Sequence, residues 1–289
     1  MKREMRLVLT FLLVPLVLSF PAITSEAKKK LEPEELIALH LDSIGTAESR
    51  AGRFSFRAHG SVKFELVTGT GLLYGSSTFL SGGPKRRMSM VFGIPDYPGE
   101  EMAFNGDEVV VGELTPGTRS ALGRFLWSFD EIVTEGLFGG TLSADWVLQD
   151  VESRNPKLKY EGLKKVDGTK YHTLKYQRRK GWDPSVRVYF DQETYRHCYT
   201  IYKVKQGAGM VRNPNASVNN TETWYTLKEA FSEFREVGPL TIPTMWTIEH
   251  TLDLGGRRGS VIRFTTAFME IENNPELDEN AFELDLDAY

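Results

Sequence analysis

The stretch FSFRAHGSVKFEL, residues 54–66, decides the fold of this chain. Apolar and polar side chains alternate along it, and successive side chains of a β-strand point to opposite faces of a sheet. The stretch therefore predicts a long strand with one buried face. The apolar side chains of this alternation are Phe54, Phe56, Ala58, Val62, Phe64 and Leu66.

A period of two recurs through most of the remaining sequence. Asn105-Gly106 and Asp167-Gly168 are dipeptides typical of two-residue hairpin turns, and Gly255-Gly256 predicts a third hairpin. The pattern indicates about ten antiparallel strands, which favour one strongly curved sheet, an unclosed β-barrel. Three further long strands are expected near the end of the chain, at residues 223–237, 242–254 and 260–271.

Helical spacing replaces this alternation in two places. Apolar residues recur every three or four positions over residues 36–44, after Pro33, and again over residues 119–137. A short third helix is expected at residues 143–148. The expected fold class is mainly β with α, with helices covering the concave side of the sheet.

The first 27 residues have the order of a secretory signal peptide. Lys2, Arg3 and Arg6 precede an uncharged apolar run over residues 7–20, and Ser25-Glu26-Ala27 offers small residues for cleavage near Ala27. The run is shorter than the roughly 20 residues that span a bilayer as a helix, although an uncleaved anchor remains the alternative. We expect a single mature domain at residues 28–289. Cys198 is the one cysteine, so no internal disulfide can form, and an exported chain of this kind fits the periplasm.

The composition argues against several classes of function. A net charge of −4 gives no electrostatic footprint for nucleic acid, and the basic runs at residues 28–30 and 178–180 are interpreted as solvated segments. No G-x-S-x-G, H-E-x-x-H or P-loop motif occurs. His197 and Cys198 are adjacent in an expected strand, so they point to opposite faces and cannot share a proton or a metal. We expect no catalysis, no metal and no cofactor; a hydrolase stays open as a third class, without a visible nucleophile–base pair.

Several segments, in their order and spacing, resemble the LolA-like superfamily of periplasmic lipoprotein carriers. They are the signal peptide with the helix at 35–45, the first strand with Gly60, and residues 163–171, 189–195, 238–243, 271–274 and 277–282. The resemblance implies an unclosed β-barrel whose apolar concavity, capped by helices, holds acyl chains. This chain is longer than the usual carriers, and none of its residues is assigned a family role.

The resemblance and the aromatic and methionine content together predict a monomeric carrier for an acylated or otherwise apolar ligand, with inner- or outer-membrane proteins as further partners. The alternative is a protein-interaction or stress-regulatory module of the envelope, with the same fold and a cavity filled by its own side chains. The segment 119–137 is a candidate lid. The ligand-cavity candidates are Phe54, Phe56, Phe64, Met88, Met90, Phe92, Phe125, Phe129, Trp246 and Ile248.

Overall fold

The computed structural model describes residues 31–178, 184–206, 222–255 and 257–284, all within one compact unit. The expected signal peptide, the basic runs except Arg178, and the loop expected at 207–220 lie outside these residues. Twelve strands in the described part form one sheet, slightly more than expected. They are β1 (Ser55–Leu66), β2 (Leu72–Gly82), β3 (Lys85–Ile94), β4 (Tyr97–Phe104), β5 (Val109–Val111), β6 (Lys157–Val166), β7 (Thr169–Gln177), β8 (Ser185–Asp191), β9 (His197–Gln206), β10 (Thr223–Val237), β11 (Leu240–Leu254) and β12 (Arg257–Asn273).

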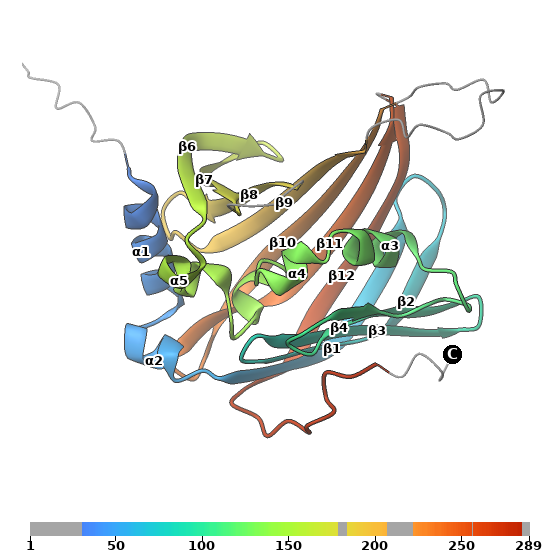
Figure 1. Ribbon diagram of the computed structural model, residues 1–289, viewed down its shortest axis with the longest axis horizontal. Helices are drawn as coiled ribbons and strands as arrows, with labels where there is room; N and C mark the ends of the chain where they lie inside the picture. Colours follow the sequence, from blue (N-terminus) through green and yellow to red (C-terminus); the bar gives the residue numbers. More distant parts are fainter. Residues whose placement is uncertain (1–30, 179–183, 207–221, 256, 285–289) are drawn as a thin grey trace, which may run out of the picture. The chain divides into compact units, whose positions relative to one another are not determined.

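The sheet is antiparallel throughout and does not close (Figure 1). Its strand order is β5-β4-β3-β2-β1-β12-β11-β10-β9-β8-β7-β6. Neighbouring strands are therefore consecutive in the sequence, with the single exception of the pair β1 and β12. These two strands pair from Phe56↔Asn273 to Leu66↔Ile262 and join the two halves of the sheet. The unclosed, curved β-structure expected from the sequence is confirmed.

The edge strands, β5 and β6, are consecutive in the sequence. The connection between them, residues 112–156, therefore has to pass from one edge of the sheet to the other, and it does so across the concave face (Figure 1). It contains α3 (Ala121–Ser128), α4 (Glu131–Thr134), the short 3-10 turns η1 (Gly140–Leu142) and η2 (Val147–Gln149), and α5 (Val151–Arg154).

Two expected helices in this connection differ from the structure. The continuous helix expected at 119–137 is broken between α3 and α4, where Phe129 leaves the helical region with φ −131°. Both helices present apolar side chains to the same sheet. The three- and four-residue spacing of apolar residues therefore continues across the break and predicted a single helix. The helix expected at 143–148 is absent: η1, which follows the left-handed backbone of Gly139, ends at Leu142, and η2 begins only at Val147.

The N-terminal helix is confirmed. α1 (Pro33–Ile44) has Pro33 in its first turn together with acidic Glu34 and Glu35, an arrangement that favours a helix start. It packs against β6, β11 and η2, and α2 (Ala47–Ala51) follows it. His40, on its buried face, accepts a hydrogen bond at Nε2 from Trp146 Nε1 (3.0 Å) and donates from Nδ1 to Tyr195 O (3.1 Å). Burial lowers the pKa of His40 to about 3, which keeps the ring neutral.

The core lies between the concave face and the β5–β6 connection. Trp246 of β11 is fully buried, and its ring centroid lies 5.4 Å from those of Phe79 and Phe138. Gly139 lets the connection approach this closely, because a Cβ there would lie 2.7 Å from the Phe79 ring. Large aromatic side chains dominate such cores, since each buries on the order of 150–250 Å².

Gly60 makes an equally close approach within the sheet. It lies at a register shift between β1 and β12, and a Cβ at this position would lie 2.0 Å from the backbone oxygen of Ala267. We expect Gly60→Ala to lower the free energy of unfolding by about 2–3 kcal/mol, because strand backbone has to move, and urea unfolding measures this. Ser61→Ala, at the exposed neighbour, is the matched control, with a change below about 0.5 kcal/mol. Equal unfolding midpoints for the two variants would contradict the close approach.

Candidate functional site

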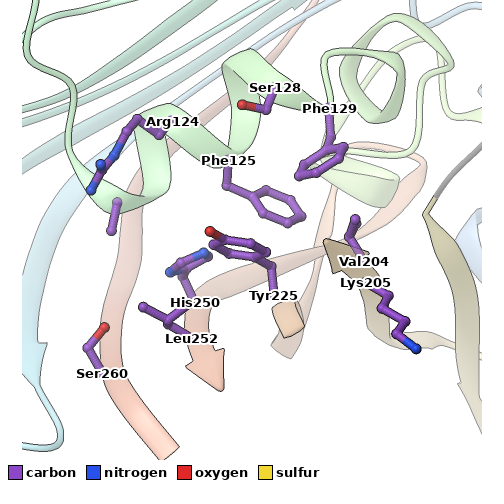
Figure 2. A pocket seen from close by; sticks show the side chains of 11 residues that line it. Arg124, Phe125, Ser128, Phe129, Val204, Lys205, Tyr225, His250, Leu252 and Ser260 are labelled. Carbon is purple, nitrogen blue, oxygen red and sulfur yellow. The ribbon is translucent and has the colours of Figure 1, made fainter. Parts of the chain in front are cut away.

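A pocket of about 710 Å³ lies between α3 and strands β9 to β12 (Figure 2). Its volume is within the range of roughly 300–1,000 Å³ typical of small-molecule sites. α3 and the residue after it form one wall, and residues of strands β9 to β12 form the other. The lining residues are Ala121, Arg124, Phe125, Ser128, Phe129, Val204, Lys205, Tyr225, His250, Leu252 and Ser260.

Helical periodicity places the α3 wall. Ala121, Arg124, Phe125 and Ser128 recur at three- and four-residue steps, so they share the side of α3 that meets the pocket. The ring of Phe125 lies 5.0 Å from that of Phe129 between centroids. This side of the pocket therefore combines two aromatic rings with the polar side chains of Arg124 and Ser128.

Strand registers place the opposite wall. Tyr225 of β10 pairs with Leu252 of β11, which pairs in turn with Ser260 of β12. His250 precedes Leu252 by two residues and therefore faces the same side. Its ring centroid lies 5.5 Å from that of Phe125 and 6.1 Å from that of Tyr225, so the imidazole is covered by aromatic rings from both walls (Figure 2).

His250 is the buried polar group of this pocket. Its side chain is 2% exposed, and neither ring nitrogen has a hydrogen-bond partner among the described residues. Burial, followed by the positive charge of Arg124, lowers the pKa of His250 to about 4. The imidazole is therefore neutral at physiological pH, with one N–H donor and one acceptor nitrogen.

The two cations of the lining differ in their pairing. Lys205 forms an ion pair with Glu222 (2.6 Å), and its ammonium lies 5.5 Å from the centroid of the Trp224 ring. Arg124 is exposed at the helix surface and forms no ion pair or hydrogen bond through its side chain within the described ranges. In Figure 2 the two side chains lie on opposite sides of the Phe125–Tyr225 pair. The lining residues thus include one cation that is neutralised by an ion pair and one that is not.

The start of α3 is attached to a buried carboxyl group. Ser120, the N-cap of the helix, accepts a hydrogen bond from Gly123 N (2.7 Å) and donates one to Glu100 Oε2 (2.6 Å). The hydroxyl of Tyr97 donates to the other oxygen of Glu100. Burial raises the pKa of Glu100 to about 7, although both hydroxyl donors favour its ionised form.

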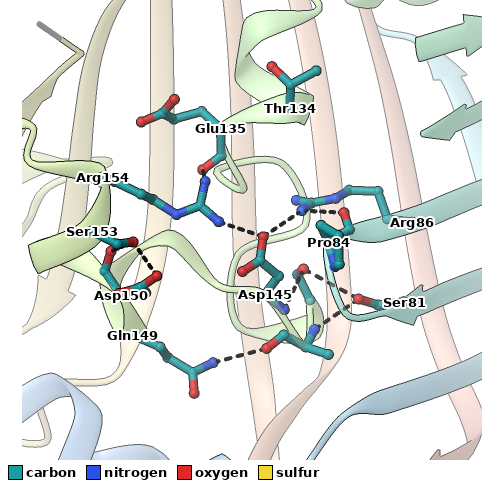
Figure 3. Close-up of polar contacts among 12 residues, drawn as sticks. Ser81, Pro84, Arg86, Thr134, Glu135, Asp145, Gln149, Asp150, Ser153 and Arg154 are labelled. Atoms are coloured by element: carbon teal, nitrogen blue, oxygen red, sulfur yellow. Dashed lines mark hydrogen bonds and ion pairs between the residues drawn. The ribbon is translucent and has the colours of Figure 1, made fainter. Parts of the chain in front are cut away.

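A second polar network fixes the rest of the connection to the sheet (Figure 3). Asp145 lies between two guanidinium groups, 2.5 Å from Arg154 Nη2 and 3.5 Å from Arg86 Nη2. Arg154 also donates to Glu135 O (2.9 Å). Arg86 is fully buried, and burial lowers its pKa to about 10. These contacts hold the segment after α4, which is therefore more firmly attached than α3.

Glu229 adds a third attachment in the core. It accepts hydrogen bonds from Gly139 N (2.9 Å), Trp246 Nε1 (3.0 Å) and the Tyr202 hydroxyl (2.7 Å). Burial raises the pKa of Glu229 to about 7. All three donors are structural groups, so this carboxyl group positions the connection.

Residues that sequence reasoning considered for chemistry are separated in the structure. His197 is fully buried and its ring stacks on that of Trp146 at 4.8 Å, whereas Cys198 is half-buried. Burial raises the pKa of Cys198 to about 11, which disfavours a thiolate. Within the described residues no three side chains of His, Cys, Asp or Glu gather as a metal site.

The ten ligand-cavity candidates fall into four groups. Phe125 and Phe129 line the pocket. Phe54 is 67% exposed, because it precedes β1 and lies outside the alternation that begins at Ser55 and Phe56. Phe64 is half-buried against the core. The others are buried in the core, away from the pocket lining: Phe56, Met88, Met90, Phe92, Trp246 and Ile248.

The cavity candidates did not include His250, Leu252 and Tyr225. A signal was present for two of them: Leu252 continues the apolar alternation of Trp246 and Ile248 along β11, and His250 lies between Ile248 and Leu252 in the same row. The alternation shows that these side chains share one face of β11. It does not show which of them lie under α3 and which lie under the segment that follows α4.

Comparison with known proteins gives distant structural likenesses. No family model matches the sequence, and no curated protein matches it. A DUF1329 family protein from Desulfovibrio piger is 10% identical with a TM-score of 0.41, covering 87% of this chain and 97% of that one. A putative outer membrane lipoprotein-sorting protein domain from Vibrio parahaemolyticus is 8% identical with a TM-score of 0.41, covering 86% and 95%. The Pseudomonas aeruginosa MucA/MucB complex contains a chain that is 8% identical with a TM-score of 0.22, covering 84% and 100%.

These neighbours include a lipoprotein-sorting domain, the class of protein that the sequence resembles. At such identities and TM-scores they carry no argument about function, which has to come from the pocket. Among the residues that the structure describes, no helix has both the length and the apolar character needed to cross a membrane.

Glu100 gives the pocket region a testable pH dependence. Its folded pKa of about 7 exceeds the ordinary value of 4.5, so the folded state binds this proton more tightly than the unfolded state. The stabilisation is complete below pH 4.5 and is lost as the pH rises towards 7. Buried His40 and His250 act in the opposite direction, since their pKa values are lowered.

The contribution of Glu100 is isolated by comparison with a neutral variant. The unfolding free energy of the wild type minus that of Glu100→Gln should fall between pH 4.5 and 7, by up to about 3 kcal/mol. Urea unfolding at several pH values measures it. Glu108→Gln, at an exposed turn, is the control and should give a flat difference. A flat difference for Glu100→Gln as well would refute the raised pKa.

Proposed function

We propose that this protein binds an acyl chain or another apolar ligand in the pocket under α3 and carries it within the periplasm between the envelope membranes. The observation that carries the proposal is the pocket itself, with a volume of about 710 Å³ and an interior bounded by Phe125, Phe129 and Tyr225. Apolar walls of this kind gain free energy by exchanging water for hydrocarbon. The sequence resemblance to lipoprotein carriers supports the same ligand class.

The proposed role includes no covalent step. Three residues of the lining carry a hydroxyl group: Ser128, Tyr225 and Ser260. Neither serine forms a hydrogen bond with His250. A hydroxyl nucleophile needs a base in hydrogen-bond contact. The described lining residues therefore offer binding groups and no such pair.

α3 is the part of the connection best suited to move during loading. The segment after α4 is held by Asp145 and Glu229, whereas α3 is held at its start by the Ser120–Glu100 contact and along its apolar face. Opening of α3 would uncover the pocket without breaking sheet hydrogen bonds. The sequence predicted a lid over residues 119–137, and we propose that only residues 121–128 of this segment move.

One observation favours the second candidate, a protein-interaction or regulatory module of the envelope. Much of the concave face is filled by side chains of the chain itself, among them Phe138, Leu142 and Trp146. A fold of this kind could use its outer surfaces for a protein partner and need no ligand. Native mass spectrometry of protein purified from its host envelope separates the two: co-purifying lipid supports the carrier, and an apo mass with a bound protein supports the module.

A variant that fills the pocket tests the carrier directly. Leu252→Trp adds an indole to the pocket floor at a half-exposed position, so it should weaken binding of a fluorescent fatty acid at least about tenfold while the protein stays folded. Thr251→Trp, on the opposite face of β11, is the matched control and should bind as the wild type does. Fluorescence titration measures both. Equal affinities for the two variants would remove this pocket as the binding site.

The expected location has its own test. If residues 1–27 are a cleaved signal peptide, protein from the periplasmic fraction should begin near Lys28 and carry no covalently attached lipid. Intact-mass measurement of the fractionated protein reads this out. An intact N-terminus in the membrane fraction would contradict it.

A further inference from the structure

The imidazole of His250 is an unsatisfied polar group of the pocket lining, covered by the rings of Phe125 and Tyr225. It is 2% exposed, lines the pocket, and has neither nitrogen in a hydrogen bond with the described residues. Buried polar groups without partners are rare in native proteins, since each one has lost its hydrogen bonds to water at a cost in free energy. A ligand atom that accepts from His250 would recover this cost on binding.

The charges of the lining residues indicate whether the ligand atom that accepts from His250 is neutral or anionic. The lining contains two cations and no Asp or Glu, although the chain as a whole has a net charge of −4. Lys205 is already neutralised by Glu222, and Arg124 is not paired. The charge of Arg124 acts on His250, because it contributes to lowering the pKa of that imidazole. An unpaired guanidinium and an unpaired imidazole thus lie at the same end of the pocket.

Ser260 adds a hydroxyl at this end, next to Leu252, and the aromatic side chains of the lining lead away from it (Figure 2). In Figure 2, Arg124, His250 and Ser260 lie on one side of the Phe125 and Tyr225 rings, and Phe129 and Val204 lie on the other. The pocket is therefore amphipathic along its length. Guanidinium groups bind carboxylate and phosphate oxygens more strongly than neutral acceptors.

We infer that the ligand is an anionic amphiphile, whose acyl chain lies between Phe125, Phe129 and Tyr225 and whose anionic head binds to Arg124 and His250. This inference rests on the proposed function and adds the orientation and charge of the ligand. The head is a carboxylate or a phosphate ester, which share oxygen acceptors and negative charge. Free fatty acids and phospholipids are the two sources of such heads.

The test compares amphiphiles of one chain length with different heads. Palmitic acid, hexadecyl phosphate, hexadecanol and hexadecylamine are each used to displace a fluorescent fatty acid from the full mature protein. The two anions should bind at least about fivefold more tightly than the alcohol, the equivalent of roughly 1 kcal/mol, and the amine should bind most weakly. The stronger of the two anions identifies the carboxylate or the phosphate source.

Three variants test which residues produce the preference for an anionic head. Arg124→Gln, at an exposed helix position, should reduce the anion-to-alcohol ratio about fivefold. His250→Leu should reduce the same ratio while the melting temperature stays equal or rises, because it removes an unsatisfied polar group. A purely structural role of His250 would instead lower the melting temperature and leave the ratio unchanged. Lys205→Gln is the matched control at the other end and should keep the wild-type ratio.

The failures of the two proposals are distinct. If no amphiphile displaces the probe, or the probe itself does not bind, the proposed function fails and this inference fails with it. If all four bind with equal affinity, the carrier stands and the anionic head is wrong. A ratio that falls in Lys205→Gln and not in Arg124→Gln would overturn the orientation.

Discussion

The concave face of an unclosed sheet has to be covered, and in this protein the strand order dictates what covers it. β5 and β6 are consecutive in the chain and lie at opposite edges of the sheet. Their connection can reach from one edge to the other only by crossing a face, and the apolar concave face retains it through the hydrophobic effect. The pocket exists where this cover is loosest: under α3, before the segment that Asp145 and Glu229 hold in place.

The local parts of this arrangement were readable from the sequence, and the non-local parts were not. Asn105-Gly106 and Asp167-Gly168 each turn a hairpin of neighbouring strands, because the backbone angles of such turns are set by the turn residues themselves. The pairing of β1 with β12 has no such local signal, since it joins residues about two hundred positions apart. The break between α3 and α4 was hidden for a related reason: apolar spacing reports which side faces the sheet, and both helices face the same sheet.

The pocket was readable only in part. Phe125 and Phe129 were predicted because they lie on the apolar side of a helical segment, and that side had to meet the sheet. Trp246 and His250 belong to one row on β11, yet Phe138 covers the first and Phe125 the second. Whether such a residue borders the pocket depends on how firmly the segment of the β5–β6 connection above it is attached to the sheet. That attachment comes from buried contacts such as the hydrogen bond from Gly139 to Glu229, which no sequence motif marks.

The open edges of the sheet have a consequence for how copies of this chain meet. β5 contributes only three residues to its edge, so it offers little backbone for another strand to add to. β6 is longer, but its pairing with β7 is interrupted between Tyr160 and Leu163, and it carries lysines at 157, 159, 164 and 165. A second copy docking along this strand would bring like charges together on an irregular backbone. The sheet can thus remain open without an edge along which further copies could add strand to strand.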